Sequence, residues 1–194
     1  MEQTTIIRII RIVLIVIVLG LFIWFVIWLF SPKQSSAPEE PAAETTTQQE
    51  QFDNVRFVQD GEITAPEQHY TIAITINATS RRIDIYQGYN TASIRSESYT
   101  NSSASYDALY AALNNVGFFS TRDDPNNLDR TSYCPLGIRY SYQAGSDIAN
   151  PSLNSWSASC SAKAGTFAGN KSDVKTLFKN QIPDYSTFTK DITL

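Results

Sequence analysis

Residues 70–86 read YTIAITINATSRRIDIY and contain the clearest strand pattern in the chain. Every second residue of Tyr70–Ile76 is large and apolar, and residues 82–86 alternate in the same way after the polar stretch 77–80. Successive side chains of a strand point to opposite faces, so an alternation of period two indicates a half-buried strand. Two such runs joined by a short polar turn predict a β-hairpin with one face in the core.

Further elements follow on the C-terminal side of this hairpin. Residues 92–99 form a weaker strand pattern, and residues 137–143 and 155–161 alternate as strands. Helical spacing of apolar residues predicts helices over 105–116, capped by Ser105, and over 171–181, capped by Ser172. The order β-β-β-α-β-β-α predicts an α+β domain over residues 52–194, with an antiparallel sheet of about five strands and two helices on one face.

Residues 12–30 are apolar throughout, with no charge, amide or hydroxyl. As a helix they span roughly 28 Å, which matches the hydrocarbon thickness of a bilayer. The helix could begin at residue 6, with Arg8 and Arg11 reaching back to the headgroups. These arginines precede the span, so residues 1–11 are expected in the cytoplasm and the domain outside, as in a single-pass cell-membrane protein.

A cleaved signal peptide is the alternative to this uncleaved anchor. Its apolar region is normally 7–15 residues long and precedes a small-x-small cleavage site. Here the apolar run is longer, and the candidate site at 35–37 is followed at once by Pro38. Residues 31–51 are rich in Pro, Ser, Thr, Gln and Glu, which predicts a disordered linker between the anchor and the domain.

The two cysteines, Cys134 and Cys160, are equidistant from Asp147. If the two flanking strands pair about a turn centred on Asp147, the cysteines face each other and Ile138 faces Trp156. Facing residues are close enough for a disulfide, and an extracytoplasmic location is oxidising. The sequence therefore predicts a Cys134–Cys160 bond, with two reduced buried thiols as the alternative.

Composition excludes several functional classes. The chain of 194 residues has a formal net charge of −4, which excludes the basic surface of a dedicated nucleic-acid binder. One histidine and two cysteines exclude most zinc and iron–sulfur sites, and no cofactor is predicted. Oxygen-bearing side chains crowd one loop and are a weak Ca²⁺ candidate, although they lack the EF-hand pattern and also suit a turn: Asp123, Asp124, Asn126, Asn127 and Asp129.

No residue is predicted to be catalytic. Ser172-Asp-Val-Lys175 matches the S-x-x-K motif of penicillin-binding proteins, and 152–154 and 163–165 resemble its companion motifs. The motifs stand in the wrong order, however, and the chain is too short for that fold. His69 has no nucleophile context around it and is expected at the surface or at a sheet edge.

Aromatic residues are the remaining functional signal. A stacking surface for a sugar or a peptide is predicted from Tyr133, Tyr140, Tyr142 and Trp156, with Tyr86 and Tyr89 as further members; the alternative is that they belong to the core. Lys171, Lys175 and Lys179 recur on one helix face, which is typical of a solvated stripe and also fits anionic glycans or lipid headgroups.

Several segments of the domain carry a resemblance: Cys134-Pro-Leu-Gly-Ile-Arg-Tyr140, Trp156-Ser-Ala-Ser-Cys160, Gly165-Thr-Phe167, Leu177-Phe178 and Gln181-Ile-Pro-Asp-Tyr185. Together they resemble short, uncharacterised single-pass membrane-anchored extracytoplasmic proteins of ultrasmall, host-attached bacteria. The resemblance covers most of the domain and implies no activity and no site residue.

The sequence thus predicts a protein tethered to the lipid bilayer through residues 12–30, with a disulfide-closed domain outside. Its expected function is that of a binding or adhesion module for an envelope glycan or a surface protein. A small extracytoplasmic hydrolase and a structural subunit of an envelope complex are the alternatives. A deep pocket that gathers His69 or paired carboxylates would favour the enzyme, whereas a flat tyrosine-bearing face would favour binding.

Overall fold

The computed structural model describes residues 51–90, 92–123, 129–161 and 164–194. By its contacts the chain divides into residues 1–47 and residues 48–194, and the described residues belong to the second unit. The predicted cytoplasmic segment 1–11, the span 12–30 and the linker up to residue 50 lie outside them. No helix in these described ranges is long and apolar enough to cross a bilayer.

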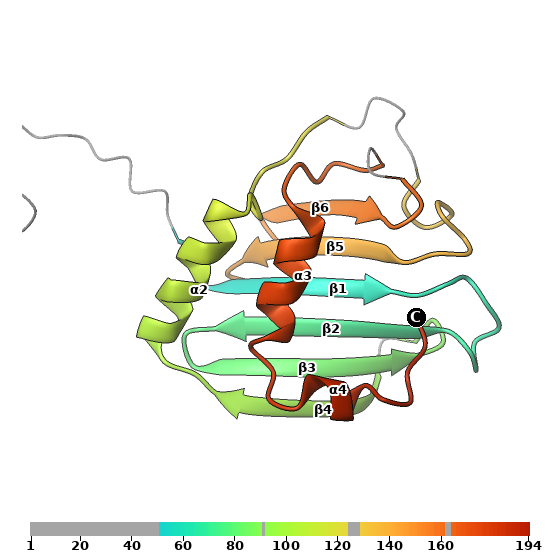
Figure 1. The fold of residues 1–194 in the computed structure, drawn as a ribbon, viewed down its shortest axis with the longest axis horizontal. Coiled ribbons are helices and arrows are strands. Elements are labelled where there is room, and N and C mark those ends of the chain that lie inside the picture. Colours follow the sequence, from blue (N-terminus) through green and yellow to red (C-terminus); the bar gives the residue numbers. More distant parts are fainter. Residues whose placement is uncertain (1–50, 91, 124–128, 162–163) are drawn as a thin grey trace, which may run out of the picture. The chain divides into compact units, whose positions relative to one another are not determined.

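Six antiparallel strands form one sheet in the order β4-β3-β2-β1-β5-β6 (Figure 1). Their bounds are β1 Asn54–Asp60, β2 Tyr70–Asn77, β3 Ser80–Gln87, β4 Ser93–Thr100, β5 Arg139–Gly145 and β6 Leu153–Ala158. The predicted α+β class and antiparallel sheet are confirmed. The predicted hairpin is formed by β2 and β3, whose isoleucines pair across the ladder as Ile72↔Ile85 and Ile74↔Ile83.

The expected number of strands, about five, is wrong by one, because the strand β1 was not predicted. It lies at the centre of the sheet and pairs with both β2 and β5. Its burial alternates, with Val55, Phe57 and Gln59 inside. Val58 is an apolar residue at an outward position, and Gln59 is a polar residue at a buried position. The sequence of this strand therefore does not show a regular alternation of apolar and polar residues.

Within the described ranges the helices are α2 Ser103–Asn115, α3 Lys171–Lys179 and the single turn α4 Tyr185–Phe188. Both predicted caps are wrong. Ser102 caps α2 by accepting from the Ser105 N–H, and Asn170 caps α3 by accepting from the Ser172 and Asp173 N–H groups. In each case the polar residue just outside the first turn has the extended backbone that a cap requires.

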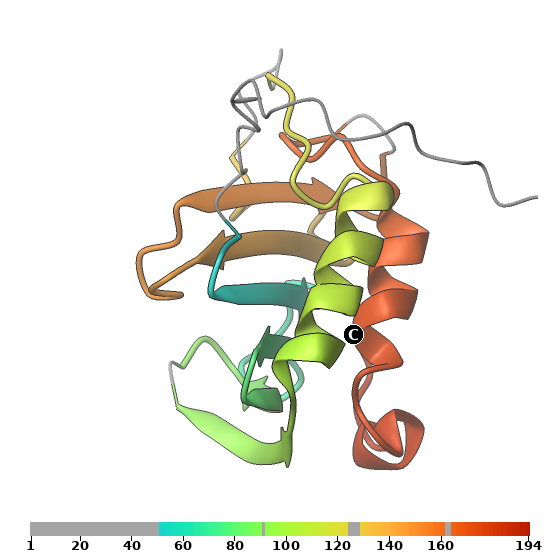
Figure 2. The same ribbon diagram turned by 90° about the vertical axis from the view of Figure 1, so that its left-hand side faces the viewer.

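Both long helices lie on one face of the sheet, and among the described residues the opposite face carries no helix (Figure 2). The isoleucines of β2 and β3 face the helices and pack with Leu113, Val174 and Phe178 in one buried core. The uncovered side is called the open face below. It carries the alternate residues of each strand, which are mostly polar or small.

The predicted pair Cys134–Cys160 is joined by a disulfide with the two Cα atoms 6.0 Å apart. The register used to predict it is wrong by three residues, because Tyr140 pairs with Ser157 and Ser141 pairs with Trp156. Cys134 reaches Cys160 from a turn before β5, where its backbone is left-handed with φ 58°. Ile138 lies beside Ser159, not Trp156.

Candidate functional site

A trough of about 580 Å³ lies on the open face. Its floor consists of outward-facing residues of β1, β2 and β3, and its sides come from the loops that follow β1, β3 and β5. The lining residues are Arg56, Asp60, Thr71 and Tyr86 from the strands, and His69, Gly88, Tyr89, Asn90 and Ala149 from the loops. Arg56 and Asp60 are four residues apart on one strand, so the trough extends about 13 Å along the sheet at 3.3 Å per residue.

One end of the trough holds an ionic network centred on Asp60. Arg139 is buried and its guanidinium lies 2.9 Å from one Asp60 oxygen. The other oxygen accepts from the Thr71 hydroxyl at 2.8 Å and lies 3.1 Å from His69 Nε2. A buried arginine needs such a partner, since an uncompensated charge in the interior is costly. This network fixes the end of β1 against the start of β5.

His69 is buried, with 3% of its surface exposed, so the expected surface position is wrong. Its Nδ1 lies 2.7 Å from the Glu62 carbonyl oxygen while its Nε2 faces Asp60. Both ring nitrogens are therefore held by acceptors. The imidazole also stacks on the Tyr89 ring, with 4.4 Å between centroids. His69 thus holds Tyr89 at the rim of the trough and is not placed as a general base toward a nucleophile.

Tyr89 leaves much of its ring available. It is 59% exposed, and its hydroxyl donates to the Thr64 carbonyl at 2.9 Å. With His69 behind one side of the ring and the hydroxyl fixed, the aromatic ring is rigidly oriented. A fixed exposed ring provides contact area at a small entropic cost on binding.

Arg56, at the floor of the trough, has no hydrogen-bond or ion-pair partner among the described residues. Its Nε is buried and has no hydrogen-bond partner. Gln143 faces Arg56 across the β1–β5 ladder, and its Oε1 is also buried without a partner. Buried polar atoms without partners cost free energy, so such a pair in a native structure requires an explanation.

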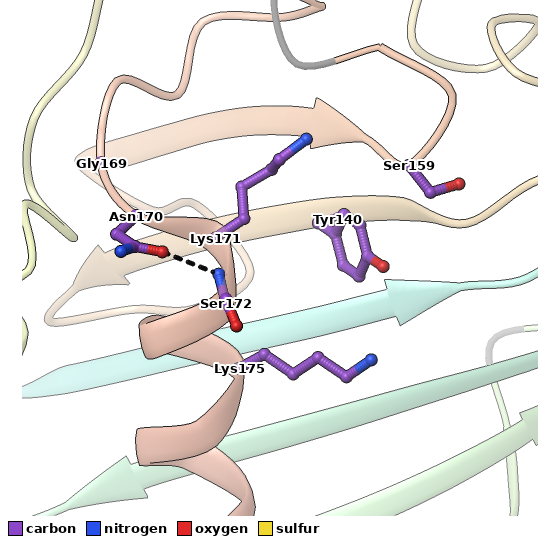
Figure 3. A pocket seen from close by; sticks show the side chains of 7 residues that line it. All are labelled: Tyr140, Ser159, Gly169, Asn170, Lys171, Ser172 and Lys175. Carbon is purple, nitrogen blue, oxygen red and sulfur yellow. Dashed lines mark hydrogen bonds between the residues drawn. The ribbon is translucent and has the colours of Figure 1, made fainter.

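A second hollow of about 600 Å³, the lysine cleft, lies beside the start of α3 on the helix side of the sheet. Its lining residues are Tyr140, Ser159, Gly169, Asn170, Lys171, Ser172 and Lys175 (Figure 3). Lys171 Nζ donates to the carbonyls of Ala158 and Ser161, at 2.9 and 3.3 Å. Burial, and then the positive charge of Arg122, lower the pKa of Lys171. This lysine therefore ties α3 to the end of β6.

The S-x-x-K pair in this cleft does not form a nucleophile–base arrangement. Figure 3 shows the Lys175 side chain extending below Tyr140, so that its amino nitrogen lies away from the Ser172 hydroxyl. Lys179, the third residue of the predicted solvated stripe, lies over the Tyr185 ring at 4.6 Å from its centroid. Two of the three lysines thus have structural contacts.

The predicted aromatic set is not brought onto one surface. Tyr142 is fully buried, stacks on Phe167 and shares a hydrogen bond with Ser157, so it belongs to the core. Tyr140 lies on the same face of β5, against Phe57. Trp156 and Tyr133 pack edge to face on the open side, near the disulfide. Of the aromatic residues named from the sequence, only Tyr86 and Tyr89 line the trough.

The calcium candidates are only partly described. Asp124, Asn126 and Asn127 lie outside the described residues, and Asp123 is exposed. Asp129 accepts from Thr131 and Ser132 within its own turn, and these hydrogen bonds lower its pKa. Within the described ranges no group of three or more His, Cys, Asp or Glu side chains could hold a metal ion.

Exposed apolar residues gather at one end of the sheet, called the loop end. They are Ile63, Tyr89, Ile94 and Leu136. The Ile63 N–H donates to Pro135 and the Tyr89 hydroxyl donates to Thr64, which links three of the loops. Ile94 is the extra residue of a bulge, since Ile85 pairs with Arg95 but Tyr86 pairs with Ser93. A bulge on an edge strand turns a side chain outward.

Sequence reasoning missed Arg56, Asp60 and Thr71, which line the trough, and Arg139, which pairs with Asp60. The unrecognised strand β1 carries two of them. Arg56 alternates with the buried Val55 and Phe57, which is a partial signal, but Val58 and Gln59 break the period over the second half of residues 54–60.

Comparisons with protein-family models, with curated proteins and with solved structures find no match to this chain. The resemblance to membrane-anchored proteins of ultrasmall bacteria therefore stays a prediction, and the function has to be argued from the site.

Proposed function

We propose that the chain is a membrane-tethered extracytoplasmic binding module that holds an envelope glycan in the trough of the open face. The proposed anchor is the apolar segment 12–30, and residues 31–51 are the spacer. The observation that carries the proposal is the trough itself, in which a rigid exposed tyrosine ring stands beside a polar floor. Aromatic faces and a few convergent polar groups are what a sugar-binding surface requires.

The placement of the trough relative to the chain entry supports this proposal. Residue 51 leads into β1 at the end of the sheet opposite to the loop end (Figure 1). Tyr89 and His69 lie at the loop end, where β1 stops and β2 begins. A tether that joins the domain at the start of β1 therefore leaves the Tyr89 end of the trough remote from the attachment point.

A hydrolase is less well supported. His69 has both ring nitrogens held by acceptors. Asp60, the acidic residue of the trough, is paired with Arg139. A general acid or base must be able to exchange a proton with a bound substrate, and neither group is positioned for this.

Docking of a partner protein is the second candidate, favoured by the exposed apolar residues of the loop end. Leu136 is 81% exposed and Ile94 is 55% exposed. Apolar side chains gathered at one end of a domain are typical of a contact surface for another protein.

The proposal is tested by measuring binding of the full-length chain, in lipid nanodiscs, to three immobilised oligosaccharides: chitotetraose, cellotetraose and tetragalacturonate. At least one should bind. Tyr89→Ala should weaken that binding by roughly three- to tenfold through loss of the ring contact, whereas Tyr89→Phe should retain it. The same affinity in Tyr89→Ala and the wild type, or no binding to any of the three sugars, would overturn the proposal.

Leu136→Ser is the matched control, because Leu136 lies at the loop end but does not line the trough. It should leave sugar binding unchanged. If it reduces binding as strongly as Tyr89→Ala does, the contact surface is the loop end rather than the trough.

A further inference from the structure

We infer that the ligand of the trough is an acidic sugar whose carboxylate is held by Arg56. This inference rests on the proposed function, since it names the chemical class of the ligand at the same site. The ligand class is a uronate-type glycan, with Arg56 as the residue that recognises the charge.

Arg56 differs from every other arginine in the described ranges. Arg82 pairs with Asp84, Arg95 with Asp191 and Arg139 with Asp60. The remaining arginines donate to carbonyl or hydroxyl oxygens: Arg81 to Thr100, Arg122 to Gly165 and Arg130 to Ser141. Arg56 has no acceptor among the described residues. Its Nε is buried without a partner, as is the Nε of Arg139, but Arg139 is already paired with Asp60 through its terminal nitrogen. Because Arg56 lines the trough, an anion bound there can reach its guanidinium group.

The net charge of the trough favours a ligand group that carries a single negative charge, such as one carboxylate. Asp60 is the acidic residue among those that line it, and it is already matched by the buried Arg139. The positive charge of Arg56 is therefore left uncompensated. A guanidinium binds a carboxylate through two parallel hydrogen bonds, and one carboxylate balances one excess positive charge.

The neighbours of Arg56 favour a sugar as the carrier of that carboxylate. Thr71 and Asn90 line the trough together with Arg56 and carry a hydroxyl and an amide that can bond to sugar hydroxyls. A uronate supplies both kinds of group, because its carboxylate accepts from the guanidinium and its ring hydroxyls donate to and accept from the polar side chains of the trough. Tyr86 and Tyr89 provide the aromatic faces on which a sugar ring packs.

The test measures the affinity of the full-length chain in nanodiscs for tetragalacturonate and for its methyl ester, which has the same sugar ring but no charge. The acid should bind about tenfold more tightly than the ester. Arg56→Gln should abolish this difference in affinity. Arg56→Lys should retain part of it, because lysine keeps the positive charge but cannot form the two parallel hydrogen bonds of a guanidinium. Circular dichroism establishes that each variant is folded.

Lys175→Gln is the matched control, since it removes a positive charge from the lysine cleft on the other side of the sheet. It should leave the preference for the acid unchanged. If Lys175→Gln removes the preference and Arg56→Gln does not, the carboxylate binds in the lysine cleft and the inference about Arg56 is wrong.

Two further outcomes separate this inference from the proposed function. Equal binding of acid and ester overturns the acidic class while glycan binding stands, whereas no binding of any sugar removes both. Hexaglutamate that binds more tightly than tetragalacturonate, with the same dependence on Arg56, would assign the site to an acidic peptide instead.

Discussion

At the residue scale, the polar groups of the domain differ in whether their partners lie inside the chain. Asp60 forms an ion pair with Arg139, lies 3.1 Å from His69 Nε2 and accepts a hydrogen bond from Thr71. Tyr142, buried on the other side of the sheet, forms a hydrogen bond with Ser157 through its hydroxyl. Arg56 has no such partner in the part of the chain that the structure describes. This contrast is what separates a structural polar residue from one available to a ligand.

Tyr142 gives a pH-dependent prediction. Burial raises the pKa of its hydroxyl above the usual value near 10, so the folded chain keeps the proton after the unfolded chain has lost it. Its stabilising contribution is complete below about pH 10 and falls as the pH rises toward the folded pKa. Tyr142→Phe should reduce the alkaline loss of stability by up to about 1.4 kcal/mol per pH unit.

The measurement is urea unfolding at intervals between pH 8 and pH 11. Ser157→Ala serves as the control, because it removes the same hydrogen bond, at a cost of about 1 kcal/mol, but keeps the titrating group. It should show the alkaline slope of the wild type. If Tyr142→Phe also keeps the full wild-type slope, the buried hydroxyl does not cause it.

The burial of a residue could be predicted where it follows from the local sequence pattern. It could not be predicted where it depends on contacts with residues far away in the chain. The alternating isoleucines of β2 and β3 were correctly placed in the core. Tyr142 was named as a surface candidate because nothing local distinguishes it from Tyr140. Its burial depends on Phe118 and Phe167, which come from other parts of the chain.

At the scale of elements, the position of a strand or helix was predicted more easily than its exact ends or register. The β5–β6 register was taken from the spacing of the cysteines, on the assumption that both lie within the ladder. Cys134 instead lies in a turn with positive φ outside it. The disulfide prediction was confirmed although the strand pairing behind it was wrong, because a turn can bring a cysteine to bonding distance from several registers.

The helix cap provides the second prediction. Asn170 accepts from the Ser172 and Asp173 N–H groups, at 3.1 and 3.3 Å. Asn170→Ala should therefore reduce the free energy of unfolding by about 1 kcal/mol. Ser172→Ala, at the position that the sequence suggested, should cost much less. Urea unfolding followed by circular dichroism compares the two variants, and an equal loss in both would contradict the structural cap.

At the scale of the whole molecule, the domain has two different faces. The helices and the lysine cleft lie on one face, and the open face carries the trough. The fold class was predictable from the sequence because each long element has a clear period. The trough was not predictable, since it needs residues of β1, β2 and β3 and of three loops to come together on one surface.

The third prediction concerns the tether. In intact cells, protease added outside should degrade a tag at Leu194 and spare a tag at Met1, because the arginines before residue 12 predict a cytoplasmic N-terminus. Immunoblots of both tags, with lysed cells as the control, give the result. Protection of the C-terminal tag in intact cells would contradict the proposed location.

The most direct test of the central claim is to map the ligand on the protein. Amide chemical shifts of the full-length chain in nanodiscs can be recorded while tetragalacturonate is added. The account predicts that the largest changes occur at Arg56, Thr71, Tyr86 and Tyr89, with little change along α2 and α3. Changes centred on the lysine cleft, or on Leu136 and Ile63 with the strand residues of the open face unaffected, would contradict it.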